Sequence, residues 1–363
     1  MFEAEAGQTG CAPSPRSETF VSIAVPTLNE QTHIRACLAS LLVQLDPKAS
    51  EILVLDGGSR DATRAIVAQI ARDHPTVRLV DNPARIQAAA INLAARTASP
   101  QADVLIRADA HADYPPNFVA EVVAALQARN AASAVVPMRT VGEKAFQRAV
   151  AAVQGSFLGN GGSAHRRGGP SRWVDHGHHA AFDRSVFLRL GGYDESFTHN
   201  EDAEYDHRLR SAGFRIWMCR AAAISYFPRE RPTALARQYY NHGRGRGRTV
   251  MRHRIRPALR QLAPPAALLG STGGLALAPL EPLFLAIPAA YLALCHAFAI
   301  ALAARRRDPA LLAAGIAATI MHFAWSAGFL RSVAGGFSIA RPPASAHLDA
   351  RPGDGPGVRP DRL

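Results

Sequence analysis

Between residues 20 and 106, short apolar runs alternate with segments whose apolar side chains recur at helical spacing. The predicted strands are residues 20–26, 51–55, 77–80 and 103–106, and the predicted helices are residues 34–45, 61–72 and 85–96. Strands that alternate with helices in this way are typical of βαβ units on a mostly parallel sheet. We therefore expect an α/β domain whose ligands bind at the carboxyl ends of its strands.

Polar segments follow three of the predicted strands, at residues 26–30, 56–59 and 107–113. They read P-T-L-N-E, D-G-G-S and R-A-D-A-H-A-D. Taken singly, each is also ordinary turn chemistry, because Asn, Asp, Gly and Ser favour loops. The sequence has no G-x-G-x-x-G after the first strand and no G-x-x-x-x-G-K-[ST], which argues against a dinucleotide-binding fold and a P-loop.

An acidic segment, residues 189–206, stands out in a chain whose formal net charge is +12. Gly191 and Gly192 suit a tight turn anchored by Tyr193, and six carboxylates follow: Asp194, Glu195, Glu201, Asp202, Glu204 and Asp206. Two interpretations are open. Either Asn200 caps a helix whose first turn carries acids that complement the helix dipole, or one carboxylate is a general base that deprotonates a hydroxyl.

The four cysteines, Cys11, Cys37, Cys219 and Cys295, have no C-x-x-C spacing. We expect reduced thiols in a cytoplasmic setting, without disulfides or a zinc site. Residues 1–19 are polar and hold no apolar run, which argues against a signal peptide and predicts a disordered tail. Residues 336–363 are expected to form a second disordered tail.

Five motifs, in this order and spacing, resemble the inverting family 2 glycosyltransferases with a GT-A fold. They are V-P-T-L-N-E, L-D-G-G-S-R-D-A-T, N-P-A-R-I-Q-A-A-A-I-N, R-A-D-A-H and G-G-Y-D-E-S-F-T-H-N-E-D. V-D-H-G-H-H-A and R-Q-Y-Y-N-H-G-R-G-R resemble more narrowly the succinoglycan-type exopolysaccharide glucosyltransferases. The resemblance covers roughly residues 20–260.

This resemblance implies a UDP-sugar donor. Asp56 would accept a hydrogen bond from the uracil N–H, and the other substrate-binding residues at the strand ends would be Pro26, Thr27, Asn29, Glu30 and Arg107. Two alternatives stay open: Asp56 forms an Asx turn before Gly57, and Glu30 simply opens the next helix.

Asp109 stands where the family carries its metal-binding D-x-D motif. The resemblance therefore implies a divalent cation, Mn²⁺ or Mg²⁺, that bridges the donor diphosphate. This chain reads D-A-H there, so the second ligand is His111 or Asp113, or the metal is held mainly by phosphate. An imidazole ligand favours Mn²⁺. The alternative is that His111 is a polar loop residue.

The second residue of the family's E-D pair is the catalytic base, which the resemblance places at Asp202. Asp202 would deprotonate the acceptor hydroxyl as that oxygen attacks C1 of the sugar opposite UDP, with inversion and without a covalent intermediate. Glu201 is expected to cap the helix and is also counted among the substrate-binding residues. Asp206 is expected to be a surface charge. The interpretation requires Asp56, Asp109 and Asp202 to converge on one cleft.

His176, His178 and His179, with Asp175, form the densest imidazole cluster and lack the i, i+4 spacing of a helical zinc site. Three interpretations are open: a third metal ligand, an acceptor contact or hydrogen-bonded loop histidines. The glycine-rich residues 159–170 are expected to form either a mobile loop that closes over donor and acceptor or an exposed linker.

An arginine collar, residues 229–260, carries ten arginines and one acid, Glu230. Arginine forks bind phosphate oxygens in pairs, so the collar predicts a grip on the donor diphosphate or on a lipid-linked diphosphate, with Gln238 and Arg244 as substrate-binding residues. The Q-x-x-R-W motif of processive relatives is not met after Gln238, which argues against processivity. Nucleic acid is the rival partner, but the apolar residues that follow argue against it.

Three apolar runs follow, at residues 263–280, 283–303 and 310–330, and a membrane-spanning helix needs about 20 apolar residues. Positive charge favours the cytoplasmic face. This places the collar and residues 305–307 inside, if the first two runs form a hairpin at Glu281 and Pro282 and the third run crosses outward. The alternative is a buried helical subdomain of a soluble protein.

The predicted organisation is a disordered tail (1–19), a GT-A domain (20–228), an Arg-rich interfacial segment (229–262), two to three transmembrane helices (263–335) and a disordered tail (336–363). We expect an enzyme on the cytoplasmic side of the inner membrane that moves a hexose, glucose by resemblance, from a UDP-sugar to a polyprenyl-diphosphate-linked saccharide in exopolysaccharide biosynthesis, forming a β linkage. No nucleic-acid partner is expected. A transferase acting directly on polyprenyl phosphate and a catalytically inactive membrane-tethered scaffold are the alternatives.

Overall fold

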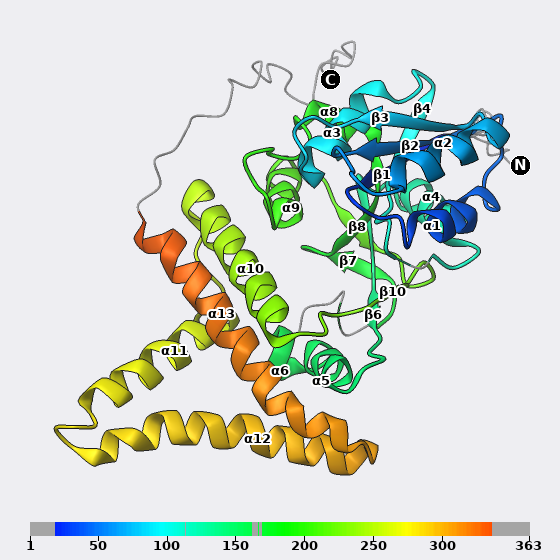
Figure 1. Cartoon of the computed structure of the whole chain (residues 1–363). Helices are drawn as coiled ribbons and strands as arrows, with labels where there is room; N and C mark the ends of the chain where they lie inside the picture. The colour runs from blue at the N-terminus through cyan, green and yellow to red at the C-terminus, as the bar shows by residue number, and fades with distance from the viewer. Residues whose placement is uncertain (1–18, 113, 162–165, 167–168, 336–363) are drawn as a thin grey trace, which may run out of the picture.

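The computed structural model describes residues 19–112, 114–161, 166 and 169–335, which form an α/β domain joined to a helical region (Figure 1). Apart from Thr19, the two predicted tails lie outside the described residues, as do Asp113 and much of the glycine-rich segment 159–170. The three described cysteines, Cys37, Cys219 and Cys295, are buried and free.

One half of the main sheet is parallel and confirms the predicted alternation. Its strands are β1 (Phe20–Thr27), β2 (Ser50–Asp56), β3 (Val77–Asp81) and β4 (Ala102–Arg107), in the order β3-β2-β1-β4. The helices between them are α1 (Ile34–Leu42), α2 (Thr63–Asp73) and α3 (Gln87–Thr97). Every residue of β2 is buried, because such a sheet is covered on both faces.

The other half of the eight-stranded sheet is mixed, which the sequence pattern did not predict. β8 (His178–Asp183) pairs antiparallel with β4 and with β5 (Ser133–Val136). β9 (Ile216–Met218) pairs parallel with β5 and antiparallel with β7 (Arg172–Val174). A separate small sheet joins β6 (Met138–Thr140) to β10 (Ile224–Tyr226). The helices of this half are α4 (Phe118–Arg129), α5 (Ala145–Gln154), α6 (Phe157–Asn160), α8 (Arg184–Arg189) and α9 (Glu201–Ser211).

The helical region consists of α10 (Pro232–His253), α11 (Leu259–Leu277), α12 (Ala286–Arg306) and α13 (Ala314–Ala334), with short 3-10 turns η1 (Pro282–Leu285) and η2 (Pro309–Ala313). α11 and α12 form the expected hairpin, which projects away from the α/β domain (Figure 1). α13 runs back along α10, the helix that carries most of the arginine collar. α13 therefore links the hairpin to the α/β domain.

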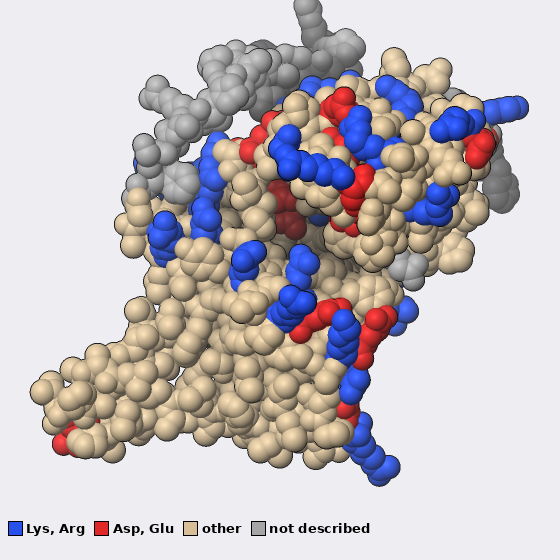
Figure 2. Space-filling model, in the orientation of Figure 1, with Lys and Arg blue, Asp and Glu red and all other residues tan. Residues whose placement is uncertain are grey.

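Two segments are long and apolar enough to cross a membrane, Pro282–Arg306 and Pro309–Ala334. They differ in surroundings, because 11% of the most apolar stretch is buried in the first segment and 39% in the second. The hairpin carries many exposed leucines, including Leu269, Leu275, Leu280, Leu283 and Leu294. Figure 2 shows it as a surface almost free of charged side chains. A helix that is apolar on its exposed sides as well as its packed side suits a lipid environment.

Close contact between α10 and α13 depends on glycine. A Cβ atom added to Gly328 of α13 would lie 2.0 Å from the backbone oxygen of Tyr240 and 2.9 Å from the amide nitrogen of Arg244. Gly328→Ala is therefore expected to force the two helices apart and to lower the unfolding free energy by about 2 kcal/mol, even after the gain in helix propensity. Thermal unfolding of the detergent-solubilised protein measures this loss.

Gly273→Ala in α11 is the matched control, because nothing lies within 4 Å of its added Cβ. That variant should be as stable as the native chain or slightly more stable, since alanine favours the helix. Equal melting temperatures for the two variants would contradict the proposed glycine contact.

Candidate active site

The carboxyl ends of β1, β2 and β4 meet at one edge of the sheet. Thr27 of β1 pairs with Asp56 of β2, and on the other side of β1 Ala24 pairs with Arg107 of β4. The three polar segments therefore lie side by side, as predicted. Figure 2 shows a hollow between the α/β domain and the helical region, with acidic atoms inside it and basic side chains around it.

Asp56 is buried and surrounded by donors. Its carboxylate accepts hydrogen bonds from the backbone N–H groups of Gly58 and Ser59 at 3.0 Å, from the Ser59 hydroxyl, and from Arg64 at 2.8 Å. Burial opposes ionisation, but these donors outweigh it and lower the pKa of Asp56. The Asx turn is thus present, and the uracil contact stays a prediction.

The segment that follows β1 is tied to the segment that follows β2. Asn29 has a φ of 57°, and its Oδ1 accepts a hydrogen bond from the amide of Arg60 at 2.9 Å. Glu30 offers its backbone carbonyl to the start of α1, while its carboxylate lies 3.1 Å from Nδ1 of His111. Glu30 therefore does both: it opens the helix and faces the segment that follows β4.

Asp109 lies at the centre of the cluster. Its Oδ1 accepts hydrogen bonds from Gln87 Nε2 at 2.9 Å and from Arg107 Nε at 3.2 Å, while its Oδ2 lies 3.6 Å from Nε2 of His178. Burial opposes ionisation of Asp109, yet Arg107 and His178 hold its pKa well below the usual range. Burial lowers the pKa of His178 to about 4. At neutral pH an ionised carboxylate therefore faces a neutral imidazole.

The arrangement around Asp109 bears on the predicted metal. Within the described residues, no three His, Cys, Asp or Glu side chains are grouped so as to hold a metal ion. Asp109 and His178 nevertheless present an oxygen and a nitrogen donor to the same space. His111 is instead engaged with Glu30. The donor set fits a cation that takes its remaining ligands from a bound phosphate.

Arg107 connects Asp109 to the acidic segment. Its side chain is 7% exposed, and Nη1 lies 3.8 Å from Oε1 of Glu201, the first residue of α9. That nitrogen is buried and makes no hydrogen bond with any described residue. Burial and the negative charge of Asp202 raise the pKa of Glu201. Because a buried donor that makes no hydrogen bond is costly, this position suits an anionic ligand.

Asp202 is half-buried at the start of α9, and its Oδ1 accepts a hydrogen bond from the amide of Ala203 at 2.8 Å. Burial opposes its ionisation, but the charges of His176 and His179 outweigh burial and lower its pKa. Asn200 occupies the N-cap position with a φ of 66°, and its side chain makes no capping bond. Helix capping alone therefore does not explain the acids of α9.

Asp206 corrects an expectation, because it is not a surface charge. It is 1% exposed, and its two oxygens lie 2.6 Å from Nδ1 of His176 and 2.7 Å from Nε2 of His179. Residues four apart share one face of a helix, so Asp202 and Asp206 both face the histidine cluster. Asp206 holds two of these imidazoles, while His178 alone faces Asp109.

The two predicted residues of the collar do not lie together. Nε2 of Gln238 donates to the Tyr226 hydroxyl at 2.8 Å, and its buried Oε1 receives no hydrogen bond from a described residue. Arg244 is exposed and lines a separate small hollow beside His199, not the cluster around Asp109. Other collar residues hold the acidic segment through Arg248 to Ser196, Arg252 to Asp194 and His253 to Glu204.

Two polar residues of α3 support the site without having been predicted. Gln87 donates to Asp109, and the side chain of Asn92 bonds both the backbone N–H and the carbonyl of Tyr193 at 2.8 Å. Both stand in the quoted N-P-A-R-I-Q-A-A-A-I-N motif, where polar side chains in a mostly apolar helix were the available signal. The predicted turn is confirmed, since Gly191 and Gly192 have φ of 79° and 66° and Tyr193 is buried.

Because the pKa of Glu204 is shifted in the folded chain, we expect the unfolding free energy of the protein to depend on pH. Burial raises the pKa of Glu204, but His253 and Arg208 outweigh burial and lower it from 4.5 to about 2. A depressed folded-state pKa stabilises the native chain above the unfolded value, and this stabilisation is lost as the pH falls from 4.5 through 2. Glu204→Gln should therefore lower the unfolding free energy at pH 7 by about 3 kcal/mol and flatten its dependence in that window.

Denaturant unfolding at several pH values measures both effects. Glu230→Gln is the control, because Glu230 pairs with Lys144 at the surface, where ion pairs contribute little. If the unfolding free energy of Glu204→Gln fell with pH in parallel with that of the native chain down to pH 2, the lowered pKa of Glu204 would not be the cause of the pH dependence.

The comparison with known proteins decides the family. Residues 22–191 match the family described as glycosyl transferase family 2. The chain is 43% identical over 324 residues to the succinoglycan biosynthesis protein ExoA of Rhizobium meliloti (strain 1021), covering 87% of this chain and 96% of that protein. The chain belongs to glycosyl transferase family 2. Family 2 membership makes it a glycosyltransferase, as the motifs implied.

Two further similarities place this family 2 glycosyltransferase among known structures and enzymes. Its fold resembles that of the mannosyltransferase PcManGT from Pyrobaculum calidifontis, in complex with GDP-Man and Mn²⁺, with a TM-score of 0.56, 23% identity and coverage of 88% and 89% of the two chains. The predicted GT-A fold is thereby confirmed. The chain is also 24% identical, over 63% of its length and 73% of the relative's, to the dolichyl N-acetyl-alpha-D-glucosaminyl phosphate 3-beta-D-2,3-diacetamido-2,3-dideoxy-beta-D-glucuronosyltransferase of Methanococcus voltae.

Proposed function

We propose that this family 2 glycosyltransferase moves a hexose, with inversion, from a UDP-sugar to a lipid-linked oligosaccharide in exopolysaccharide biosynthesis. The observation that carries the proposal is the junction at Arg107, where Asp109 at the end of β4 meets the start of α9, which holds Asp202. The name of the 43% identical relative, a succinoglycan biosynthesis protein, supports an exopolysaccharide as the product.

Asp202 is the proposed base. Its carboxylate is ionised at neutral pH, is half-buried, and has one oxygen that accepts a hydrogen bond from the amide of the next residue. It accepts the proton of the acceptor hydroxyl while that oxygen forms a bond to C1 of the sugar and the bond from C1 to UDP breaks. Inversion of an α-linked donor gives a β-linked product. His176 and His179, held by Asp206, keep the carboxylate ionised before each reaction.

The donor is proposed to lie along the edge formed by β1, β2 and β4. Nη1 of Arg107, which lies 3.8 Å from Glu201 but makes no hydrogen bond with a described residue, supplies a donor for a phosphate oxygen. At the uridine end, Asp56 already accepts four hydrogen bonds. Because the side chain of Asp56 is also 0% exposed, a uracil contact requires Arg64 or Ser59 to move aside, and Pro26, Thr27 and Asn29 are expected to contribute mainly shape.

A divalent cation is proposed beside Asp109. Asp109 and His178 would hold it, with His111 as the alternative second ligand, and the donor diphosphate would supply further oxygen ligands. When bound, such a cation neutralises charge that develops on the departing UDP. The imidazole of His178 favours Mn²⁺ over Mg²⁺. Gln87 and Arg107 fix the Asp109 oxygen that points away from His178.

The hairpin of α11 and α12 is the proposed membrane anchor, with the catalytic domain on the cytoplasmic side of the inner membrane. The collar leads into α11 in the chain, and Arg305, Arg306 and Arg307 stand at the end of α12, so positive charge flanks both ends of the hairpin, as expected at the cytoplasmic face. α13 is proposed to remain at the membrane surface, because it packs along the arginine-bearing α10. A reporter fused after residue 335 should then lie on the cytoplasmic side, and a periplasmic reporter would contradict this topology.

The test of function uses the purified full-length protein in membranes, a panel of labelled UDP-hexoses and a lipid-linked glycan. The proposal expects one UDP-hexose to yield UDP and a lipid product longer by one hexose. Label recovered as a polyprenyl monophosphate sugar would instead identify a transferase acting directly on polyprenyl phosphate. UDP release no faster than in Asp202→Asn membranes would identify an inactive scaffold.

A further inference from the structure

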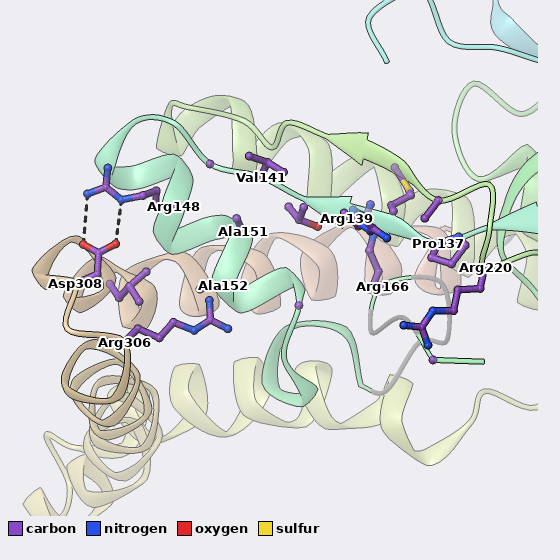
Figure 3. A pocket seen from close by; sticks show the side chains of 17 residues that line it. Pro137, Arg139, Val141, Arg148, Ala151, Ala152, Arg166, Arg220, Arg306 and Asp308 are labelled. Atoms are coloured by element: carbon purple, nitrogen blue, oxygen red, sulfur yellow. Dashed lines mark hydrogen bonds and ion pairs between the residues drawn. The ribbon is translucent and has the colours of Figure 1, made fainter. Parts of the chain in front are cut away.

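A cavity of about 580 Å³ lies where the α/β domain meets the helical region (Figure 3). Its walls come from β6 and the turn that follows, from α5, and from the junction between α12 and η2. None of the residues predicted to bind the donor, the metal or the acceptor lines it. The cavity is therefore distinct from the strand edge that holds Asp56 and Asp109.

The cavity is strongly basic. It is lined by one carboxylate, Asp308, and by five arginines: Arg139, Arg148, Arg166, Arg220 and Arg306. Arg148 is engaged, because its Nε and Nη2 bond the two oxygens of Asp308 at 3.0 and 3.3 Å (Figure 3). No acid in the described part of the chain pairs with the other four guanidinium groups. Several arginine forks around one space form a site suited to phosphate oxygens.

One of these arginines also has a buried atom without a partner. Nη1 of Arg166 makes no hydrogen bond with any described residue, and its guanidinium carbon lies 4.7 Å above the ring of Tyr226. The hydroxyl of the same tyrosine accepts a hydrogen bond from Gln238 of α10 at 2.8 Å. Arg166 therefore lines the cavity and also packs on Tyr226, the residue that Gln238 of α10 contacts.

The opposite wall of the cavity adjoins the apolar hairpin. Arg306 is the last residue of α12, and Ala152 of α5 packs with Ala303 and Leu311 against this junction. Ile300, less than two turns before Arg306, is 59% exposed. An anionic headgroup in the cavity would therefore leave an attached hydrocarbon chain beside the exposed apolar surface of α12, as at a membrane interface.

We propose that this cavity binds the diphosphate of a polyprenyl lipid, with the lipid chain along α12 and the attached saccharide directed past Arg166 toward Asp202. The inference rests on the proposed function, because it gives the lipid-linked acceptor its anchoring site. The cavity, and not the arginine collar, is then the main binding site of that diphosphate. Arg139, Arg220 and Arg306 are the principal ligands, and Arg148 keeps its place by pairing with Asp308.

The test compares two triple variants of the full-length protein by flotation with zwitterionic vesicles that contain a small fraction of polyprenyl diphosphate. R139Q/R220Q/R306Q should bind these vesicles about 100-fold more weakly than the native chain, because several charge-assisted hydrogen bonds are lost. R231Q/R237Q/R256Q removes the same charge from exposed collar positions and should bind nearly as well as the native chain. Thermal unfolding confirms that both variants are folded.

Three further measurements decide the identity of the ligand. UDP affinity should be unchanged in R139Q/R220Q/R306Q, and a matching loss of UDP affinity would overturn the proposal in favour of the donor diphosphate. Inorganic diphosphate should displace the native chain from these vesicles, and failure to do so would overturn the diphosphate as the recognised group. Equal loss of binding to phosphatidylglycerol vesicles would overturn the acceptor assignment and identify a general anionic lipid site.

Failure of the proposed function gives a different result from failure of this inference. A native chain that binds polyprenyl diphosphate through the cavity, but transfers no sugar to any lipid-linked glycan, contradicts the proposed function alone. A native chain that transfers sugar normally, while R139Q/R220Q/R306Q keeps the native KM for the lipid acceptor, contradicts the cavity assignment alone.

Discussion

Asp202→Asn is expected to lower the rate of sugar transfer about a thousand-fold, since an amide cannot accept the proton of the acceptor hydroxyl. The substitution keeps the size of the side chain and an oxygen that can accept the hydrogen bond from Ala203. Donor affinity should therefore change little. Product formation from labelled UDP-sugar gives the rate, and equilibrium titration with UDP gives the affinity.

Asp175→Asn is the matched control, because Asp175 belongs to the same histidine-rich cluster in sequence but is 81% exposed and pairs with Arg210 at the surface. This variant should transfer sugar at the native rate. If Asp202→Asn retained more than about a tenth of the native rate, a contribution typical of a general base would be absent. The base would then have to be another group at the start of α9.

Asp109→Asn is expected to lower kcat/KM for the donor about a thousand-fold, because a bound cation supplies several kcal/mol of charge stabilisation when UDP departs. The asparagine oxygen can still accept from Gln87 and Arg107, so the fold should persist. The readout independent of activity is calorimetric titration of Mn²⁺ in the presence of UDP. Affinity for Mn²⁺ should be lost in this variant.

The second metal ligand is identified by two further variants. His178→Ala should weaken Mn²⁺ binding strongly, because His178 lies 3.6 Å from Asp109. His111→Ala should weaken it less, because His111 is paired with Glu30. The reverse order would return His111 to the role that its place in the D-A-H motif suggests. Unchanged Mn²⁺ binding by Asp109→Asn would contradict the metal proposal altogether.

The sequence predicted the parallel half of the sheet well, because its strands are mostly apolar and a segment of helical spacing separates each from the next. The mixed half was missed, since β5, β7 and β9 are only three or four residues long and show no clear period. The antiparallel placement of β8 beside β4 is a tertiary arrangement, and this is the strand that brings His178 to Asp109. Local pattern alone does not contain that information.

Sequence reasoning likewise found the part of the site that follows from local pattern and missed the part that depends on tertiary arrangement. Residues at strand ends, such as Asp56 and Asp109, follow from topology, because parallel strands end at a shared edge. Asp206 was misjudged as a surface charge, since its burial depends on two histidines that reach it from a loop and from β8. Arg244 was grouped with the substrate by its position in the collar, although its direction from α10 places it beside His199.

The continuous packing of α13 against α10 fixes the distance between the reaction centre and the hairpin. α10 holds the acidic segment at Asp194 and Glu204, and α13 ties α10 to the hairpin. For a bilayer-anchored enzyme, Asp202 then stands at a constant height above the lipid headgroups. With the proposed anchor and lipid-linked acceptor, such an assembly would select glycans by length, because only a glycan with the right number of sugars would present its terminal hydroxyl at that level.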